Sequence, residues 1–137
     1  MTTSNPAPAR ARSIRVSAAV IVNDRDELLL VRKAGTTAFM QPGGKPEAGE
    51  TPAETLSREL FEELGLSVDA AQLRPLGSFT AAAANEPGFV VEADVFEAEI
   101  GDQVPVIAAE IEELRWVARA DAEHLEVAPL ARENFLP

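Results

Sequence analysis

The feature that most constrains the fold is a helix whose two ends are both marked in the sequence. Thr51 is a good N-cap, and Glu54 completes a Thr-x-x-Glu capping box in which side chains and backbone groups pair reciprocally. A proline follows the cap, which suits the first helical position. Gly65 can take the left-handed conformation that ends a helix. These signals predict a helix over residues 52–64.

The two sides of this helix differ in chemistry. One side gathers an apolar stripe that we expect to pack inward, formed by Ala53, Leu56, Leu60 and Leu64. Phe61 lies at its margin, spaced to contact Leu66 in a Schellman ending. Glu59, Glu62 and Glu63 stand at i, i+3 and i+4, so their carboxylates share an arc of roughly 100° beside the stripe.

Three neighbouring carboxylates repel one another, by a few tenths of a kcal/mol per pair on an exposed helix and by more at a core margin. A hard divalent cation offsets this repulsion. Magnesium prefers oxygen ligands and commonly takes few carboxylates, with waters and substrate phosphates completing its shell. The alternative is a solvated acidic helix face, which is the commoner meaning of Glu-x-x-Glu-Glu by itself.

Hydrophobic runs and turn residues predict the remaining elements. Apolar residues at 14–22 and 28–31 flank the turn formers Asn23 to Asp26, which indicates a β-hairpin. Two further strands, separated by a turn, should pair as neighbours at 73–84 and 89–100. The last elements are a strand at 111–117 and short helical pieces at 120–125 and 130–135, with Pro129 between them.

Length and composition favour one soluble domain. The 137 residues suffice for a single core, which we place at residues 13–137. Residues 1–12 lack the apolar centre of a signal peptide and indicate a disordered tail. Without a cysteine, the chain has no disulfide, thiolate metal site or cysteine nucleophile, which fits the cytoplasm. No apolar run reaches about 18 residues, so we expect no membrane span.

The segment Gly44 to Leu66, GKPEAGETPAETLSRELFEELGL, resembles the box that defines the Nudix hydrolase family. That pattern asks for Gly, five residues, Glu, seven residues, Arg-Glu, an aliphatic residue, any residue, Glu-Glu, any residue, Gly and an aliphatic residue. The matching positions are Gly44, Glu50, Arg58, Glu59, Leu60, Glu62, Glu63, Gly65 and Leu66. The strands before this segment and residues 114–117 after it also look like those of the family.

This resemblance implies an α/β fold: a Nudix-type α/β/α sandwich with a mixed β-sheet and a loop-helix-loop catalytic segment. It implies that Glu59, Glu62 and Glu63 bind metal, with Glu50 supporting the site. The cofactor would be Mg²⁺, with Mn²⁺ as a substitute. The implied reaction is hydrolysis of a diphosphate linkage in a nucleoside diphosphate derivative, in which bound metal neutralises the diphosphate and activates water.

Two more residues of the segment are candidates for the site. As in the family, Arg58 is expected to pair with a box glutamate, most simply Glu50; the alternative is an exposed helical arginine. Gly44, with Gly43 before it, would let the backbone approach metal or phosphate closely. A structural turn explains two glycines equally well in isolation.

Charged residues outside the segment are further candidates. Arg32 and Lys33 end the second predicted strand, where a basic residue reaches substrate phosphates in many Nudix enzymes; an ordinary edge charge is the alternative. Near residue 113 the family often places a glutamate that binds metal or takes a proton from water. Glu113 is our first candidate for this role and Glu110 the second. The alternative is that these glutamates are solvated surface charges without a catalytic role.

The substrate is predicted mainly by elimination. The chain has no tyrosine, and Ala82 stands roughly where ADP-ribose hydrolases carry a proline, so we favour nucleoside triphosphates, including oxidised ones. The alternatives are ADP-ribose or another nucleotide sugar, or a nucleotide-binding module without catalysis. The residues before Gly43, Phe39-Met40-Gln41-Pro42, depart from the aromatic-x-Leu-Pro sequence that is commoner in the family. This departure affects the expected shape of the pocket.

Charge and the remaining aromatic residues complete the expectations. The net charge of −11 opposes a nucleic-acid polymer as partner but not a small nucleotide, because a bound cation inverts the local field. The sequence leaves homodimerisation open. Trp116 and Phe89 are more typical of a core than of base stacking. His124, the only histidine, receives no role.

Overall fold

The computed structural model describes residues 12–136, and its first helix, α1 (Pro52–Leu64), has the predicted bounds. Thr51 and Glu54 form the predicted capping box. Gly65 closes the helix with a φ of 66° and donates to the Phe61 carbonyl. The sequence signals at both ends are therefore confirmed.

The strands form two sheets. The larger sheet has the order β3-β1-β5-β4, in which β1 runs parallel to β5 and the other pairs are antiparallel. The smaller sheet joins β2 and β6 in antiparallel register. The strand bounds are β1 (Arg12–Val20), β2 (Leu28–Lys33), β3 (Gly43–Gly44), β4 (Arg74–Ala82), β5 (Phe89–Glu97) and β6 (Ile111–Val117). The predicted pairing of β4 with β5 is confirmed.

The prediction that β1 and β2 form a hairpin is wrong, except for one bridge next to the turn. Val22 and Leu28 form a single antiparallel bridge around the turn, after which the two strands enter different sheets. The reason is that the edge of β1 along which β2 would continue is hydrogen-bonded to residues 42–44, which pair with Ser17, Ala18 and Ala19. The other edge pairs with β5 over the full length of β1.

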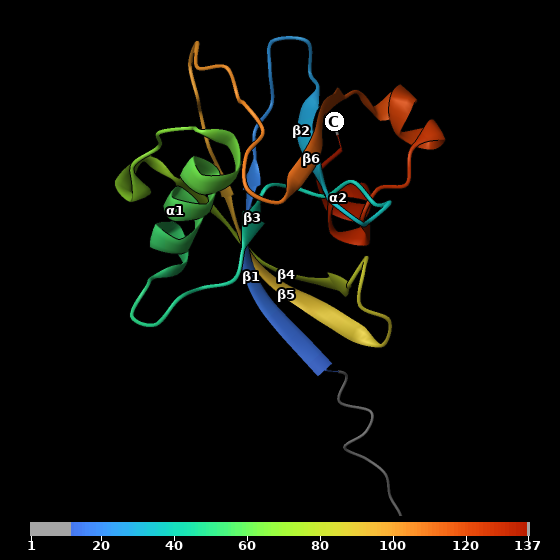
Figure 1. The fold of residues 1–137 in the computed structure, drawn as a ribbon, viewed down its shortest axis with the longest axis horizontal. Coiled ribbons are helices and arrows are strands. Elements are labelled where there is room, and N and C mark those ends of the chain that lie inside the picture. The colour runs from blue at the N-terminus through green and yellow to red at the C-terminus, as the bar shows by residue number, and fades with distance from the viewer. Residues whose placement is uncertain (1–11, 137) are drawn as a thin grey trace, which may run out of the picture.

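Two buried clusters separate the layers, with α1 over one side of the sheets and α2 (Pro129–Asn134) over the other (Figure 1). Leu56, Leu60 and Leu64 of α1 pack against Ala19 and Leu29. Leu130 and Ala131 of α2 belong to the second cluster, with Ala18, Val20 and Val95. Successive residues of β1 thus serve opposite layers, and the predicted α/β sandwich is confirmed.

Short elements differ modestly from their predictions. The piece expected at 120–125 is the 3-10 helix η3 (Arg119–His124), Pro129 is the first residue of α2 instead of a separator, and η2 (Ala70–Gln72) was not predicted. The expected disordered tail falls outside the described residues, except that Arg12 is the first residue of β1. No helix within residues 12–136 has the length and hydropathy needed to cross a bilayer.

Candidate active site

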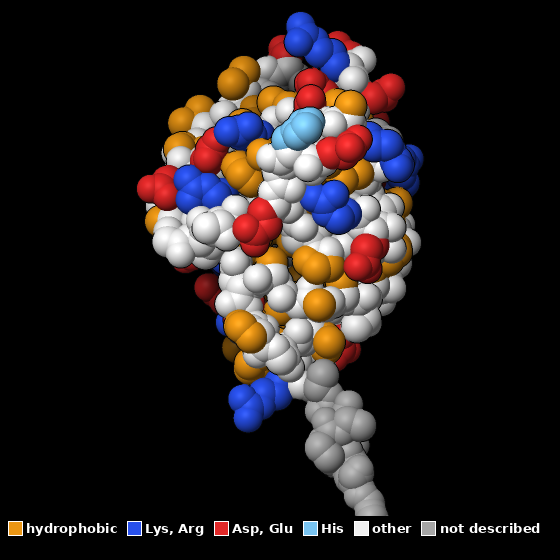
Figure 2. Space-filling model, turned by 90° about the vertical axis from the view of Figure 1, so that its right-hand side faces the viewer, with side chains coloured by type: hydrophobic (Ala, Val, Ile, Leu, Met, Phe, Trp, Pro, Cys, Tyr) orange, Lys and Arg blue, Asp and Glu red, His pale blue; other side chains and the backbone are white. Residues whose placement is uncertain are grey.

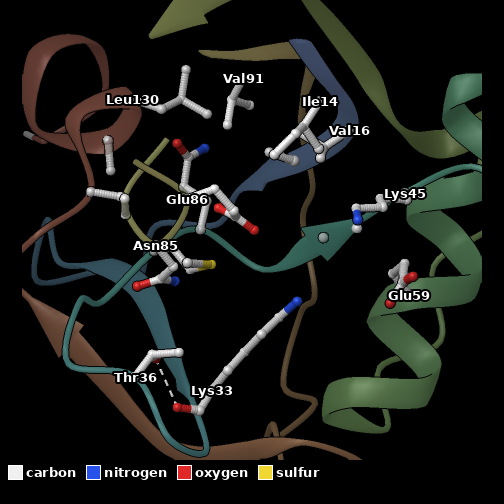
Figure 3. Close-up of a pocket in the computed structure, with 18 of the residues that line it drawn as sticks. Ile14, Val16, Lys33, Thr36, Lys45, Glu59, Asn85, Glu86, Val91 and Leu130 are labelled. Atoms are coloured by element: carbon white, nitrogen blue, oxygen red, sulfur yellow. Dashed lines mark hydrogen bonds between the residues drawn. The ribbon is translucent and has the colours of Figure 1, made fainter. Parts of the chain in front are cut away.

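A cavity of about 550 Å³ lies where β1, the Gly43–Gly44 segment and α1 meet the β4–β5 loop and α2. At its polar end Glu59, Lys45 and the long side chain of Lys33 face one another (Figure 3). Ile14, Val16, Val91 and Leu130 line the rest of the cavity, where Asn85 and Glu86 of the β4–β5 loop also lie (Figure 3). The cavity therefore has a cluster of charges at one end and a largely apolar wall, reached by one carboxylate, at the other.

Helix α1 buries a carboxylate and exposes a phenyl ring. Glu63 is 4% exposed, whereas Phe61 is 63% exposed and is not part of the apolar stripe that packs inward. At 100° per residue, Glu63 shares the inward face with Leu56, while Phe61 lies outside it. Burying a carboxylate is costly unless a partner compensates. This inversion indicates that the inward glutamate serves a ligand.

The two glycines bring the backbone against β1 and α1. A methyl group on Gly43 would overlap the Ser17 carbonyl oxygen, and one on Gly44 would overlap the Glu59 carboxylate. Gly43 also has a φ of 150°, which side chains rarely adopt, and its N–H donates to Glu63 Oε1 at 3.4 Å. Close approach, and not only a turn, explains the Gly-Gly pair.

The electrostatics of the inward carboxylates favour a cation. Burial, reinforced by the Glu59 carboxylate, raises the pKa of Glu63 to about 7. Burial also raises the pKa of Glu59, although Arg58 opposes that shift. Within residues 12–136, no Lys, Arg or His nitrogen lies within 4.0 Å of the Glu63 carboxylate. Each group would gain its charged form by binding a positive ligand.

Arg58 organises the loop before the helix. It donates to both oxygens of Glu50, with Nε–Oε2 at 2.6 Å and Nη2–Oε1 at 3.0 Å, which confirms the predicted pairing. Its hydrogen bonds lower the pKa of Glu50 to about 2. Arg58 also donates to the Lys45 carbonyl, which follows Gly44 directly. The ion pair therefore fixes the loop that carries the glycines.

Glu62 lies beside Glu59 but, unlike Glu59 and Glu63, does not line the cavity. Its side chain is half exposed and accepts from Arg58 Nη1 at 3.1 Å, and the same nitrogen donates to Glu59 Oε2 at 3.2 Å. In the described part of the chain, no three acidic or histidine side chains converge as a ready-made metal site. Glu59 and Glu63, set around the close approach of Gly44, are the residues that fit a divalent cation.

The basic residues at the end of β2 have different surroundings. Arg32 donates to Glu112, Glu113 and the Thr36 carbonyl and does not line the cavity. Lys33 does line it, with Nζ 3.7 Å from Glu110. Lys33 is thus the residue of this pair that the structure places near the carboxylates.

The two candidate glutamates of the β6 region also separate. Glu113 pairs with Arg32 and Arg115 on the sheet surface, which lowers its pKa, and it does not line the cavity. Glu110, the second candidate, lines the cavity across from Glu63 and is largely exposed. A catalytic role for Glu113 remains a prediction, and the geometry brings only Glu110 to the site.

Several cavity residues were not singled out as site residues from the sequence. Lys45 directly follows Gly44, so its position in the motif was a usable signal. Asn85 and Glu86 were assigned only to a turn, and nothing local indicated that the β4–β5 loop reaches the cavity (Figure 3). Trp116 packs against the core as expected and His124 is exposed, but Phe89 belongs to neither core cluster and lies under the Arg12 guanidinium.

Comparison with known proteins places this geometry in a family. The NUDIX domain family matches residues 13–137. An 8-oxo-dGTP diphosphatase of Haemophilus influenzae is 41% identical over 64 residues, which are 44% of this chain and 47% of that protein. An RNA pyrophosphohydrolase of Halorhodospira halophila is 49% identical over 47 residues, 34% of this chain and 26% of that protein. These matches span less than half the length of the curated relatives.

Solved structures share the fold over most of the chain. The Escherichia coli ORF135 protein has a TM-score of 0.65 at 25% identity, covering 91% of this chain and 87% of its own. A MutT protein from Methanosarcina mazei Go1 has a TM-score of 0.68 at 24% identity, covering 88% and 87%. With the domain match over residues 13–137 and the glutamate-bearing helix in place, the chain belongs to the Nudix family.

Proposed function

We propose that this chain hydrolyses a diphosphate linkage of a nucleoside triphosphate, oxidised forms included, with Glu59 and Glu63 holding Mg²⁺. The observation that carries the proposal is the carboxylate pair around Gly44, of which Glu63 is buried and Glu59 partly buried, in a cavity that Lys33 and Lys45 also line. A bound divalent cation would neutralise the diphosphate and activate the attacking water. Mn²⁺ can substitute because it also prefers carboxylate oxygen.

The chain's own residues have distinct tasks in this proposal. Lys33 and Lys45 lie beside the carboxylates and bind phosphate oxygens. Arg58 holds Glu50 and the Lys45 carbonyl, and so positions the backbone at Gly44. Glu110, which lines the cavity, would accept a proton from the attacking water. Glu62 would add a ligand on turning away from Arg58.

The cavity favours a free nucleotide over a polymer. Its volume suits one small molecule. On the face shown in Figure 2, acidic and basic side chains are interspersed, with no continuous basic stripe. The net charge of −11 also opposes a long polyanion. RNA with a 5′-triphosphate, suggested by the RNA pyrophosphohydrolase relative, belongs in the test as a competing substrate.

A nucleotide panel tests the proposal. Purified protein is incubated with standard and oxidised nucleoside triphosphates, ADP-ribose, a nucleotide sugar and 5′-triphosphate RNA, with Mg²⁺ or with EDTA. The products are then resolved by chromatography, so that nucleoside mono- and diphosphates and sugar phosphates are measured together with released phosphate and pyrophosphate. We expect turnover of a triphosphate with Mg²⁺ only, and a loss of about 10³-fold in kcat in Glu63→Gln. Glu123→Gln, an exposed glutamate away from the cavity, is the matched control.

Each other outcome has a definite meaning. Full turnover in Glu63→Gln would refute the role of the buried carboxylate. Preference for ADP-ribose or a nucleotide sugar would replace the substrate class while keeping the chemistry. Nucleotide binding without any turnover would make the chain a non-catalytic binding module.

A further inference from the structure

Glu86 presents a carboxylate to the cavity from the loop that joins β4 to β5. Two backbone hydrogen bonds fix this loop, from the Ala83 N–H to the Phe89 carbonyl at 3.0 Å and from the Phe89 N–H to the Glu86 carbonyl at 3.1 Å. The residue is exposed and lines the cavity. Figure 3 shows its carboxylate beside the largely apolar wall, away from Glu59 and Lys45. An occupant of the cavity can therefore touch this carboxylate.

The Glu86 carboxylate has no partner in the described part of the chain. No hydrogen bond and no ion pair within residues 12–136 involves its side chain. The other acidic side chains of the cavity each have a partner: Glu59 has Arg58, Glu63 has the Gly43 N–H, and Glu110 has Lys33. Glu86 is thus the acidic residue of the cavity that is available to a donor on the occupant.

The charges of the cavity set the direction in which a nucleotide lies. Lys33 and Lys45 attract phosphate oxygens, as does a cation held by Glu59 and Glu63, whereas the Glu86 carboxylate repels them. The nucleobase is separated from the phosphates by the sugar, so it lies towards Glu86. The largely apolar wall suits the face of a flat heterocycle. The carboxylate then meets the edge of the base.

The chemistry of a carboxylate selects one kind of base edge. An ionised carboxylate donates no hydrogen bond, and its two oxygens can accept from two neighbouring N–H groups at once. Guanine carries such a pair, the ring N1–H beside the exocyclic amino group. Adenine and cytosine set an amino group beside a ring acceptor, and uracil sets its ring N–H between two carbonyl oxygens. Those acceptors would face the carboxylate unpaired, which lowers affinity.

We propose that Glu86 is a specificity-determining residue, whose carboxylate accepts two hydrogen bonds from the N1–H and the amino group of a guanine base. The inference rests on the proposed function, because it takes a nucleotide as the occupant. It is independent of the choice between standard and oxidised nucleotides. Oxidation at C8 leaves this edge of the base unchanged, so Glu86 recognises guanine and 8-oxoguanine alike.

GTP and ITP test the proposal, because ITP lacks only the exocyclic amino group. We expect the wild-type protein to prefer GTP by about tenfold or more in kcat/KM, and Glu86→Gln to reduce that preference to less than about twofold. The amide of this variant sets a donor beside an acceptor, which complements adenine and not guanine. The ratio of ATP to GTP in kcat/KM should therefore rise about tenfold in Glu86→Gln. Glu86→Ala should lose the preference for GTP without this gain for ATP.

Controls separate recognition of the base from other roles. Glu99→Gln is the matched control, because Glu99 is also an exposed loop glutamate but does not line the cavity. Its preferences should equal those of the wild type. The Tm of the Glu86 variants should stay unchanged, since the side chain makes no hydrogen bond or ion pair within residues 12–136. GTP and dGTP test the sugar: if Glu86→Gln changes their ratio and not that of GTP to ITP, the carboxylate binds ribose and the proposal is wrong.

A binding measurement distinguishes this inference from the proposed function. GMP, IMP and AMP are titrated into the wild-type protein and into Glu86→Gln by calorimetry with Mg²⁺ present. Tighter binding of GMP than of IMP in the wild type alone supports the inference even if no triphosphate is hydrolysed, in which case only the proposed function fails. Hydrolysis with the same base preferences in the wild type and in Glu86→Gln overturns the inference alone.

Discussion

The two ends of the cavity are built in different ways. At the charged end, Gly44, Glu59 and Glu63 come from 20 consecutive residues and are set by a capped helix and the loop before it. At the apolar end, Val16 and Leu130 come from β1 and α2, which are far apart in the sequence. The first end is specified locally, and the second depends on strand register and on the docking of α2.

This difference assigns different consequences to substitutions. Changes at the charged end should lower the rate constant, because they alter groups that act on the diphosphate. Changes at the apolar end should alter affinity and the choice of nucleotide, because that end touches only the non-reacting part of the substrate. Substitutions at each end of the cavity test this division.

Gly44→Ala should reduce kcat by more than about 10²-fold, since a displacement near 1 Å at a reacting centre has that effect. The new methyl group would overlap the Glu59 carboxylate and push it from its place. Gly101→Ala is the control, because Gly101 has a φ of 60° and open space around it. Steady-state kinetics and Tm are measured for both. Wild-type kcat in Gly44→Ala would show that the close approach is not needed.

The sequence predicted the charged end well for a physical reason. Thr51, Glu54 and Gly65 are helix signals that act within a few residues, so they hold in any tertiary context. The i, i+3 and i+4 spacing then fixed which glutamates are neighbours. Spacing alone did not reveal that Glu63 is buried and Glu62 turned outward, because depth in the core depends on what packs against the helix.

The apolar end and the sheet were not predictable by the same means. The turn after Val22 indicated a hairpin, but the edge of β1 that β2 would have used bonds to residues 42–44, and the opposite edge is paired with β5. Such pairing joins residues about 77 apart in the sequence, for example Val16 with Ala93. Gln41 was visible as a departure from the usual pattern, yet its burial emerges only from the packed structure.

The two glutamates near β6 offer a sharper test of the charged end. Glu110→Gln should lower kcat about tenfold, because Glu110 lines the cavity near Glu63. Glu113→Gln should change kcat less than about twofold, since its carboxylate is occupied by Arg32 and Arg115 outside the cavity. The pH dependence of kcat is measured for both variants. The reverse ranking would restore Glu113 as the catalytic glutamate.

At the apolar end, Val91→Ala should raise KM about fivefold while leaving kcat nearly unchanged. The substitution removes two methyl groups from the surface against which we place the nucleobase. Val104→Ala, at an exposed position outside the cavity, is the matched control. KM and kcat are obtained separately for the preferred nucleotide. A loss confined to kcat would break the division of tasks between the two ends.

The smallest effect concerns stability without metal. The folded-state pKa of Glu63, about 7, lies above its ordinary value of 4.5, so its protonated form is favoured by folding. The free energy of unfolding gained from protonated Glu63 is complete below pH 4.5 and is lost as the pH rises through 7. Its full size is about 3 kcal/mol. The pKa of Glu50 is lowered to about 2, so its opposite contribution changes only below this window.

In EDTA, the Tm of the wild-type protein should therefore fall relative to that of Glu63→Gln between pH 5 and pH 8. The amide of the variant stays neutral in place of the buried carboxylate, which removes this dependence. Mg²⁺ should close the gap by stabilising the wild type more at pH 8 than at pH 5, since a cation binds the ionised form. Calorimetry with and without metal measures both differences. If the Tm of the wild type and of Glu63→Gln changed with pH in the same way in EDTA, ionising Glu63 would not destabilise the folded protein. A cation would then have no such cost to offset.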